Sequence, residues 1–161
     1  MIAYTSMLSD EEREFCGWFW GEGSYHIKKV VSPNSKSKKP YYQPSITVTQ
    51  REDDPGTLRW CVNRFGGLLV RRSTVSPSMA RNGYGANPRL TWQVAGFKRC
   101  KMVVEVLSQG KLPSKKRAEL QIFKEFLSTY MGSGKVSTEQ SLSLQAGLKQ
   151  KLSEFKKYKP L

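Results

Sequence analysis

Hydrophobic residues recur along this chain with two different periods, and the first period is that of a helix. The spacing predicts a helix over 10–22. Ser9 and Glu12 stand three residues apart at its start, which is the capping-box spacing of a helix N-terminus. Gly17 and Gly21 lie four residues apart on one face, where the absence of side chains lets another helix approach closely. The other face carries the apolar residues that we expect in the core, which are Phe15, Trp18 and Phe19.

A carboxylate ends this predicted helix. Glu22 stands between Gly21 and Gly23 and is followed directly by a strand-like stretch. A buried helix with a glycine C-cap would explain the glycines alone. A helix C-terminus presents unpaired carbonyl groups and a partial negative charge, so an acidic side chain there is unfavourable unless a cation compensates. The position of Glu22 therefore indicates a functional carboxylate.

The rest of the chain switches between strand-like and helical periods. Alternation of polar and apolar residues predicts strands at 24–31, 41–50, 68–73 and 89–94. Helical spacing predicts further helices at 55–65, capped by Asp54, and at 96–107, 114–131 and 137–157. This order predicts an α+β fold: an αββαββα core with a saddle-shaped antiparallel or mixed sheet, helices on one face, and additional C-terminal helices. We expect a single domain over 1–161, with its core at about 8–130.

One face of the predicted sheet is polar and basic. Side chains of this kind contact base edges and phosphates when β-ribbons enter a groove of DNA. On the third and fourth strands, the outward positions are expected to be Leu69, Arg71, Ser73, Arg89, Thr91 and Gln93. The residues that we expect to contact DNA are Ser24, His26, Lys28, Tyr41, Gln43, Ser45, Thr47, Arg71, Arg89, Thr91 and Gln93.

The composition supports a polyanionic partner. Lys and Arg number 27 against 13 Asp and Glu, and the resulting net charge of +14 favours nucleic acid over an acidic protein or a small substrate. Cys16, Cys61 and Cys100 are widely spaced in apolar helical patterns, so we expect reduced core thiols in an intracellular protein. The sequence contains no apolar run of membrane-spanning length and no signal pattern, so we expect no membrane partner. With His26 as the only histidine and no CxxC pair, we expect no structural zinc.

One stretch of the predicted first helix resembles the motif of the LAGLIDADG homing endonucleases. Small residues hold the second and third places, apolar residues follow, and the motif closes on a small residue, an acid and a glycine. The motif residues, in order, are Phe15, Cys16, Gly17, Trp18, Phe19, Trp20, Gly21, Glu22 and Gly23, followed by Ser24, Tyr25 and Ile27. Trp20 occupies a place that is often acidic in this family. The predicted element order also fits the αββαββα core of the family, so the resemblance covers the chain through about Tyr130.

The resemblance implies roles for individual residues. Family members with one motif act as homodimers whose motif helices pack together, which would place Gly17 and Gly21 in the dimer interface. Glu22 of both copies, with the Gly21 carbonyls, would hold divalent cations, and the oxygen preference of Mg²⁺ fits these ligands. The resemblance also implies a Gln that orders water beside the metal and a basic residue near the scissile phosphate, for which the matching positions are Gln50 and Lys115 or Lys116.

The resemblance thus implies a site-specific DNA endonuclease. Such an enzyme would cut both strands of a long, near-palindromic site with a divalent metal and leave 3′ overhangs. The alternative is a non-cleaving nucleic-acid binder of the same fold, either a maturase that assists intron splicing, with intron RNA as its partner, or a DNA-binding regulator. The compartment stays open between an organelle (chloroplast or mitochondrion) and a prokaryotic or archaeal cytoplasm.

Overall fold

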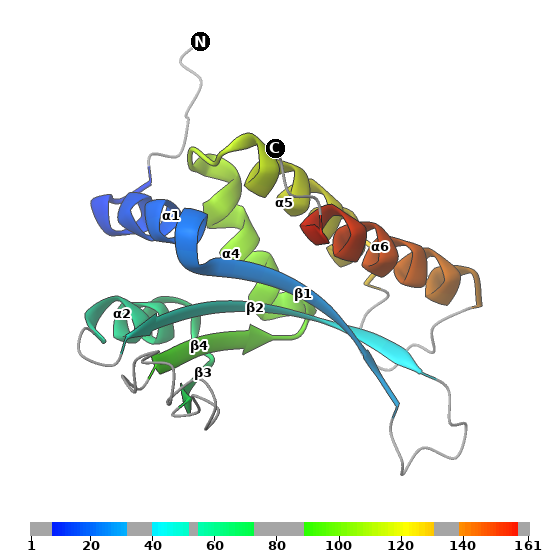
Figure 1. The fold of residues 1–161 in the computed structure, drawn as a ribbon, viewed down its shortest axis with the longest axis horizontal. Helices are drawn as coiled ribbons and strands as arrows, with labels where there is room; N and C mark the ends of the chain where they lie inside the picture. The colour runs from blue at the N-terminus through cyan, green and yellow to red at the C-terminus, as the bar shows by residue number, and fades with distance from the viewer. Residues whose placement is uncertain (1–7, 32–39, 52–54, 73–88, 131–138, 158–161) are drawn as a thin grey trace, which may run out of the picture.

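The computed structural model describes residues 8–31, 40–51, 55–72, 89–130 and 139–157 (Figure 1). Its helices are α1 (Asp10–Glu22), α2 (Gly56–Phe65), α4 (Phe97–Gln109), α5 (Ser114–Leu127) and α6 (Glu139–Lys157). Its strands are β1 (Gly23–Val30), β2 (Tyr41–Arg51), β3 (Leu68–Arg72) and β4 (Arg89–Ala95). Some predicted end positions lie outside the described residues: Asp54, Ser73, Met131, Ser137 and Thr138. No helix in the described part of the chain combines the length and the apolar character that a membrane span needs.

The described strands form one antiparallel sheet in the order β1-β2-β4-β3. Figure 1 shows β1 and β2 as long curved ribbons, with α4, α5 and α6 together on one side of the sheet. A hydrophobic core joins the inner face of the sheet to these helices and to α1 and α2. The predicted α+β fold is confirmed, and the sheet is antiparallel rather than mixed.

Helix α1 begins and ends at the predicted residues. The Glu12 N–H donates to Ser9 Oγ at 3.1 Å, and the Ser9 N–H donates to Glu12 Oε1 at 3.0 Å. This capping box satisfies two backbone donors that the helix leaves unpaired, and the bond from the Ser9 backbone lowers the pKa of the Glu12 carboxyl. The neighbouring Glu11 accepts a hydrogen bond of 2.7 Å from Trp60 Nε1, which ties α1 to α2.

Aromatic side chains from α1, α2 and β4 pack in the core. The Phe15 ring centroid lies 5.3 Å from that of Phe65 and 6.0 Å from that of Trp92. Trp92 Nε1 donates to the carbonyl that follows α2 at 2.8 Å. The prediction that Trp18 enters the core is only partly correct, because Trp18 is half-buried while Cys16 is buried. The core-facing stripe of α1 runs through positions 15, 16 and 19, which leaves position 18 at its margin.

The three cysteines are free and buried, as predicted for reduced core residues. Burial raises the pKa of the Cys16 thiol to about 11 and those of Cys61 and Cys100 to about 12. The reactive thiolate is therefore scarce near neutral pH. We expect the thiol reagent DTNB to label none of the cysteines in the folded protein and all of them after unfolding in guanidinium. Rapid labelling of the native protein would contradict their buried positions.

Candidate functional site

The end of α1 and the start of β1 meet at an exposed carboxylate. Glu22 is the last residue of α1, and it is exposed. Gly23 follows as the first residue of β1, and its N–H donates to the Phe19 carbonyl. A β-carbon at position 23 would overlap the Phe19 ring, so the sharp change from helix to strand requires glycine there. The junction leaves the Glu22 carboxylate open to a ligand.

Lys116 brings a positive charge to the junction of α1 and β1. The last turn of α1 contains no basic residue. Lys116 approaches from the first turn of α5, and its Nζ donates to the Gly23 carbonyl at 2.5 Å. Burial lowers the pKa of Lys116, and the carboxylate of Glu119, 3.9 Å away, opposes this shift. Lys115 is exposed, so Lys116 is the member of the predicted pair that lies at the junction.

Gln50 lies on β2, just past the residues that pair with the start of β1. The register of β1 and β2 sets Gly23 opposite Val48. Strand β2 continues beyond this pair to Arg51, and Gln50 pairs there with Leu90 of β4. The Gln50 side chain is half-exposed. Of the predicted site residues, Lys116 thus contacts the residue that follows Glu22, and Gln50 lies on β2 two residues past the partner of Gly23.

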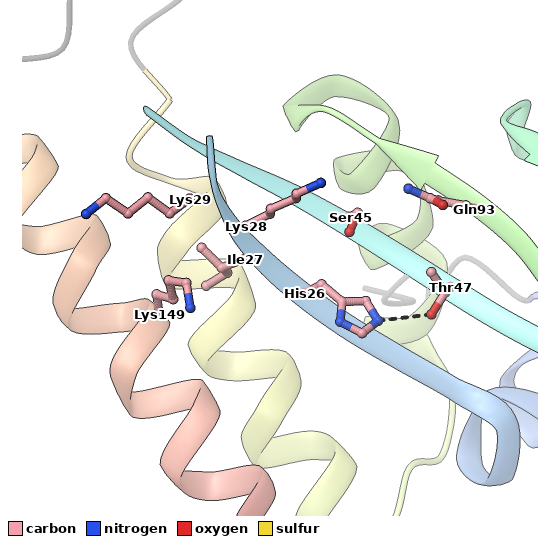
Figure 2. Close-up of a pocket in the computed structure, with 8 residues that line it drawn as sticks. All are labelled: His26, Ile27, Lys28, Lys29, Ser45, Thr47, Gln93 and Lys149. Atoms are coloured by element: carbon pink, nitrogen blue, oxygen red, sulfur yellow. Dashed lines mark hydrogen bonds between the residues drawn. The ribbon is translucent and has the colours of Figure 1, made fainter. Parts of the chain in front are cut away.

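Polar side chains of β1, β2 and β4 line the open face of the sheet. The strand register places Ser24, Thr47 and Gln93 in one row across the three strands. Figure 2 shows His26 on the same face, where its Nε2 lies 3.0 Å from Thr47 Oγ1. A hollow of about 560 Å³ opens here, lined by His26, Ile27, Lys28, Lys29, Ser45, Thr47, Gln93 and Lys149. By the same register, the predicted positions Tyr41, Gln43 and Arg89 belong to this face.

Three predicted positions differ from the structure. Thr91 belongs to the open face, but it is only 3% exposed and its Oγ1 lies 2.9 Å from Thr49 Oγ1, so little of it is accessible. The placement of Arg71 on this face is wrong. Arg71 pairs with Leu90, and paired residues of an antiparallel ladder share a face, so Arg71 belongs to the helix side of β3. The same register moves Leu69 to the helix side, because it pairs with the buried Trp92.

A lysine of α6 also lines the hollow, and the sequence pattern predicts no DNA contact from this helix. Figure 2 shows Lys149 projecting from α6 toward the outer side of β1, near Lys29. Lys149 and Lys156 stand seven residues apart and so lie on one face of α6, which is the available signal in the sequence. The signal cannot show that this face packs beside β1, because the two segments are far apart in the chain.

The outward side of α1 is open where its glycines lie. A β-carbon at Gly17 or Gly21 would meet no atom within 4 Å. Trp20 lies on the same side of the helix and is 42% exposed. A hollow of about 570 Å³ opens beside Gly17 and Trp20, with the end of α4 and Lys111 also lining it. An exposed tryptophan beside an open helix surface is typical of a protein contact surface.

The arrangement of helices and strands matches that of solved homing endonucleases. I-CvuI, solved in complex with a DNA target, aligns over 94% of this chain and 85% of its own, with a TM-score of 0.69 and 16% identity. I-LtrWI, a LAGLIDADG homing endonuclease solved bound to target DNA, aligns over 94% of this chain and 46% of its own, with a TM-score of 0.66 and 20% identity. I-TnaI aligns over 92% of this chain and 97% of its own, with a TM-score of 0.64 and 18% identity. This chain has the LAGLIDADG homing endonuclease fold.

The likeness to LAGLIDADG homing endonucleases is found by comparing structures and not by comparing whole sequences. No family model matches the chain, and no curated protein matches its sequence significantly. The resemblance predicted from the motif at 15–23 is confirmed for the fold, with α1 as the motif helix. At these identities the likeness establishes the LAGLIDADG fold alone, so an argument for activity must start from the site residues of this chain.

Proposed function

We propose that this chain is a site-specific DNA endonuclease that uses a divalent cation, acts as a homodimer and cuts both strands of a long, near-palindromic site. The observation that carries the proposal is the exposed Glu22 carboxylate at the end of the motif helix α1. A purely structural helix end would not favour an acid at this position. Lys116 contacts the Gly23 carbonyl and Gln50 follows the β2 residues that pair with the start of β1, which supports roles for them as the positive charge and the amide in chemistry on a phosphodiester.

Charge and surface chemistry support duplex DNA as the substrate. The chain carries a net charge of +14, which favours binding to a polyanion. The open face of the sheet presents hydroxyl, amide, imidazole and ammonium groups, which suit both phosphates and base edges. I-CvuI and I-LtrWI, which share the fold, were solved in complex with target DNA. We therefore assign the open face of the sheet as the DNA-binding surface.

Oxygen donors at the end of α1 suit a hard divalent cation. The Glu22 carboxylate is exposed, and the Gly21 carbonyl belongs to the last helical turn, where backbone carbonyls lack partners within the helix. Mg²⁺ prefers oxygen ligands and commonly binds through one or two carboxylates. I-CvuI was crystallised in the presence of Mg in one complex and Ca in another. We infer that Glu22 and the Gly21 carbonyl hold Mg²⁺.

The residues around Glu22 can divide the chemistry among them. When bound, the cation supplies Lewis-acid charge to the phosphodiester and activates the attacking water. Gln50, partly exposed on β2, would orient that water through its amide group. Lys116 would place a positive charge where negative charge develops on the phosphate oxygens. Glu22 would hold the cation.

A second copy of the chain completes the proposed site. Each chain offers one Glu22, and a site that cuts two strands needs the same residues twice. The open side of α1, with Gly17, Gly21 and the exposed Trp20, suits close packing of two such helices. This chain aligns with slightly less than half of I-LtrWI, which was solved bound to target DNA, so two copies would match the length of that chain.

A cleavage screen tests this function. A library of randomised linear duplexes is incubated with the protein and Mg²⁺, and the new ends are sequenced. We expect breaks in both strands with 3′ overhangs at one family of near-palindromic sites, and no cutting when EDTA removes the metal. If lysine–phosphate contacts dominate binding, affinity for the selected site should fall roughly 10³-fold between 50 and 200 mM salt.

The same screen separates the nuclease from the non-cleaving alternative. If no duplex is cut although the protein binds DNA in a salt-dependent manner, the nuclease assignment is wrong and a DNA-binding regulator is indicated. Preferential binding of structured intron RNA, used as a second probe, would indicate a maturase instead.

A further inference from the structure

The outer edge of β1 is held by lysines from two helices. Among the strands that the structure describes, β1 lies at the edge of the sheet and pairs with β2 alone. The carbonyl groups of alternate residues on such an edge have no partner within the sheet. Lys116 Nζ of α5 donates to the Gly23 carbonyl, and Lys156 Nζ of α6 donates to the Tyr25 carbonyl. The two lysines thus donate hydrogen bonds to two successive outward-facing carbonyl groups at the start of β1.

Lys156 reaches this position from the last turns of α6. Its Nζ also lies 3.4 Å from Ser24 Oγ, so it contacts two adjacent residues of the strand. Ser24 belongs to the open, DNA-facing side of the sheet, whereas Tyr25 is fully buried on the helix side. Lys156 therefore contacts both the buried and the DNA-facing part of β1, two residues after Glu22.

The lysine pair, Lys116 and Lys156, is charged and partly buried. Both pKa values are lowered by burial and raised in part by the charge of Glu119, which is 4% exposed. Two ammonium groups around one buried carboxylate leave a net positive charge beneath the start of β1. Partly burying a second cation is costly unless the cation makes hydrogen bonds and interacts with an opposite charge. The hydrogen bonds of Lys156 to β1 offset this cost.

We propose that Lys156 is a positioning residue for the active site: it fixes the first residues of β1 from the side opposite β2 and thereby sets the direction of Glu22. The inference rests on the proposed nuclease function. Glu22 is the last residue of α1, so the direction of its carboxylate is set by the helix together with the backbone that leads from Glu22 into β1. That backbone is held by β2 on one side and by the lysine pair on the other. The C-terminal helix α6 thus contributes one positioning residue to the site.

Hydrogen exchange tests the placement independently of cleavage. Lys156→Met removes the donor and keeps much of the apolar stem, while Lys151→Met changes an exposed lysine of the same helix and serves as the matched control. In Lys156→Met we expect amide exchange over residues 22–26 to rise at least about 10-fold, because the outer edge of β1 loses a partner. Exchange in the cores of α5 and α6 should keep the wild-type rate. A uniform rise across α5, α6 and β1, or no rise at 22–26, would overturn the proposal.

Cleavage kinetics test the consequence. At saturating DNA and Mg²⁺, Lys156→Met should cut roughly 10- to 100-fold more slowly, since small displacements of a reacting group have effects of this size. Its Kd for DNA should stay within about threefold of wild type, and Lys156→Arg should recover most of the rate. An unchanged rate, or a loss that appears only in Kd, would overturn the positioning role. If the wild-type protein cuts no duplex, the proposed function fails, and the exchange measurement still decides whether Lys156 holds β1.

Discussion

Glu22→Gln is expected to abolish DNA cleavage while DNA binding survives. The substitution keeps the shape of the side chain and removes the charge that the proposed metal site needs, so the cleavage rate should fall by about 10³-fold or more. Glu22 is exposed at the C-terminus of α1, where a negative charge is unfavourable, so the fold should be retained or slightly stabilised. Removing an anion from the DNA side of the protein should leave Kd equal to that of the wild type or lower.

The measurement pairs single-turnover cleavage with a binding titration on the site selected by the library. Glu14→Gln is the matched control, because Glu14 is an exposed carboxylate of the same helix, about two turns before Glu22. The control should cut at the wild-type rate. Full cleavage by Glu22→Gln would remove Glu22 from the catalytic site, and loss of binding by the same variant would point to a role in DNA recognition instead.

Signals that are local in the sequence predict the fold well. The capping box of Ser9 and Glu12 and the glycine at 23 determine both ends of α1, and the predicted and observed bounds coincide. Gly66 and Gly67 directly follow α2. Gly67 has φ 95°, and a β-carbon there would overlap the Gln93 carbonyl, so glycine is required for a reason that only the structure shows.

The sequence predicts less about features that depend on tertiary packing, such as which face of a strand meets the core. Alternation within β3 shows which residues share a face but not which face meets the core, and the wrong phase placed Arg71 on the DNA side. Thr91 lies on the predicted face of the sheet but is buried, with its hydroxyl group hydrogen-bonded to Thr49 on the neighbouring strand. Lys156 contacts β1 across a large separation in the chain, so no spacing rule could assign it to the site.

Gly17→Leu is expected to separate folding from dimer formation. A β-carbon at position 17 would meet no atom of the described residues within 4 Å, and the hollow of about 570 Å³ beside it leaves room for a leucine side chain. Leucine also has a higher helix propensity than glycine, which should raise the stability of α1 by up to about 1 kcal/mol. Between two closely packed α1 helices, the same side chain would be present twice and would force the helices apart. The variant should therefore fold and remain monomeric.

Sedimentation of the free protein and of its DNA complex measures this outcome. The wild type should bind with two chains per site, and the variant should lose roughly 10²-fold or more in affinity, because each half-site is then bound separately. Gly147→Leu in α6 is the matched control, since a β-carbon at position 147 also meets no atom within 4 Å. Gly23→Leu gives the opposite contrast: its side chain would overlap the Phe19 ring, so the chain itself should be destabilised. Two chains of Gly17→Leu per site at wild-type affinity would show that the copies do not meet through α1, and would leave the pairing of the two Glu22 carboxylates without a structural basis.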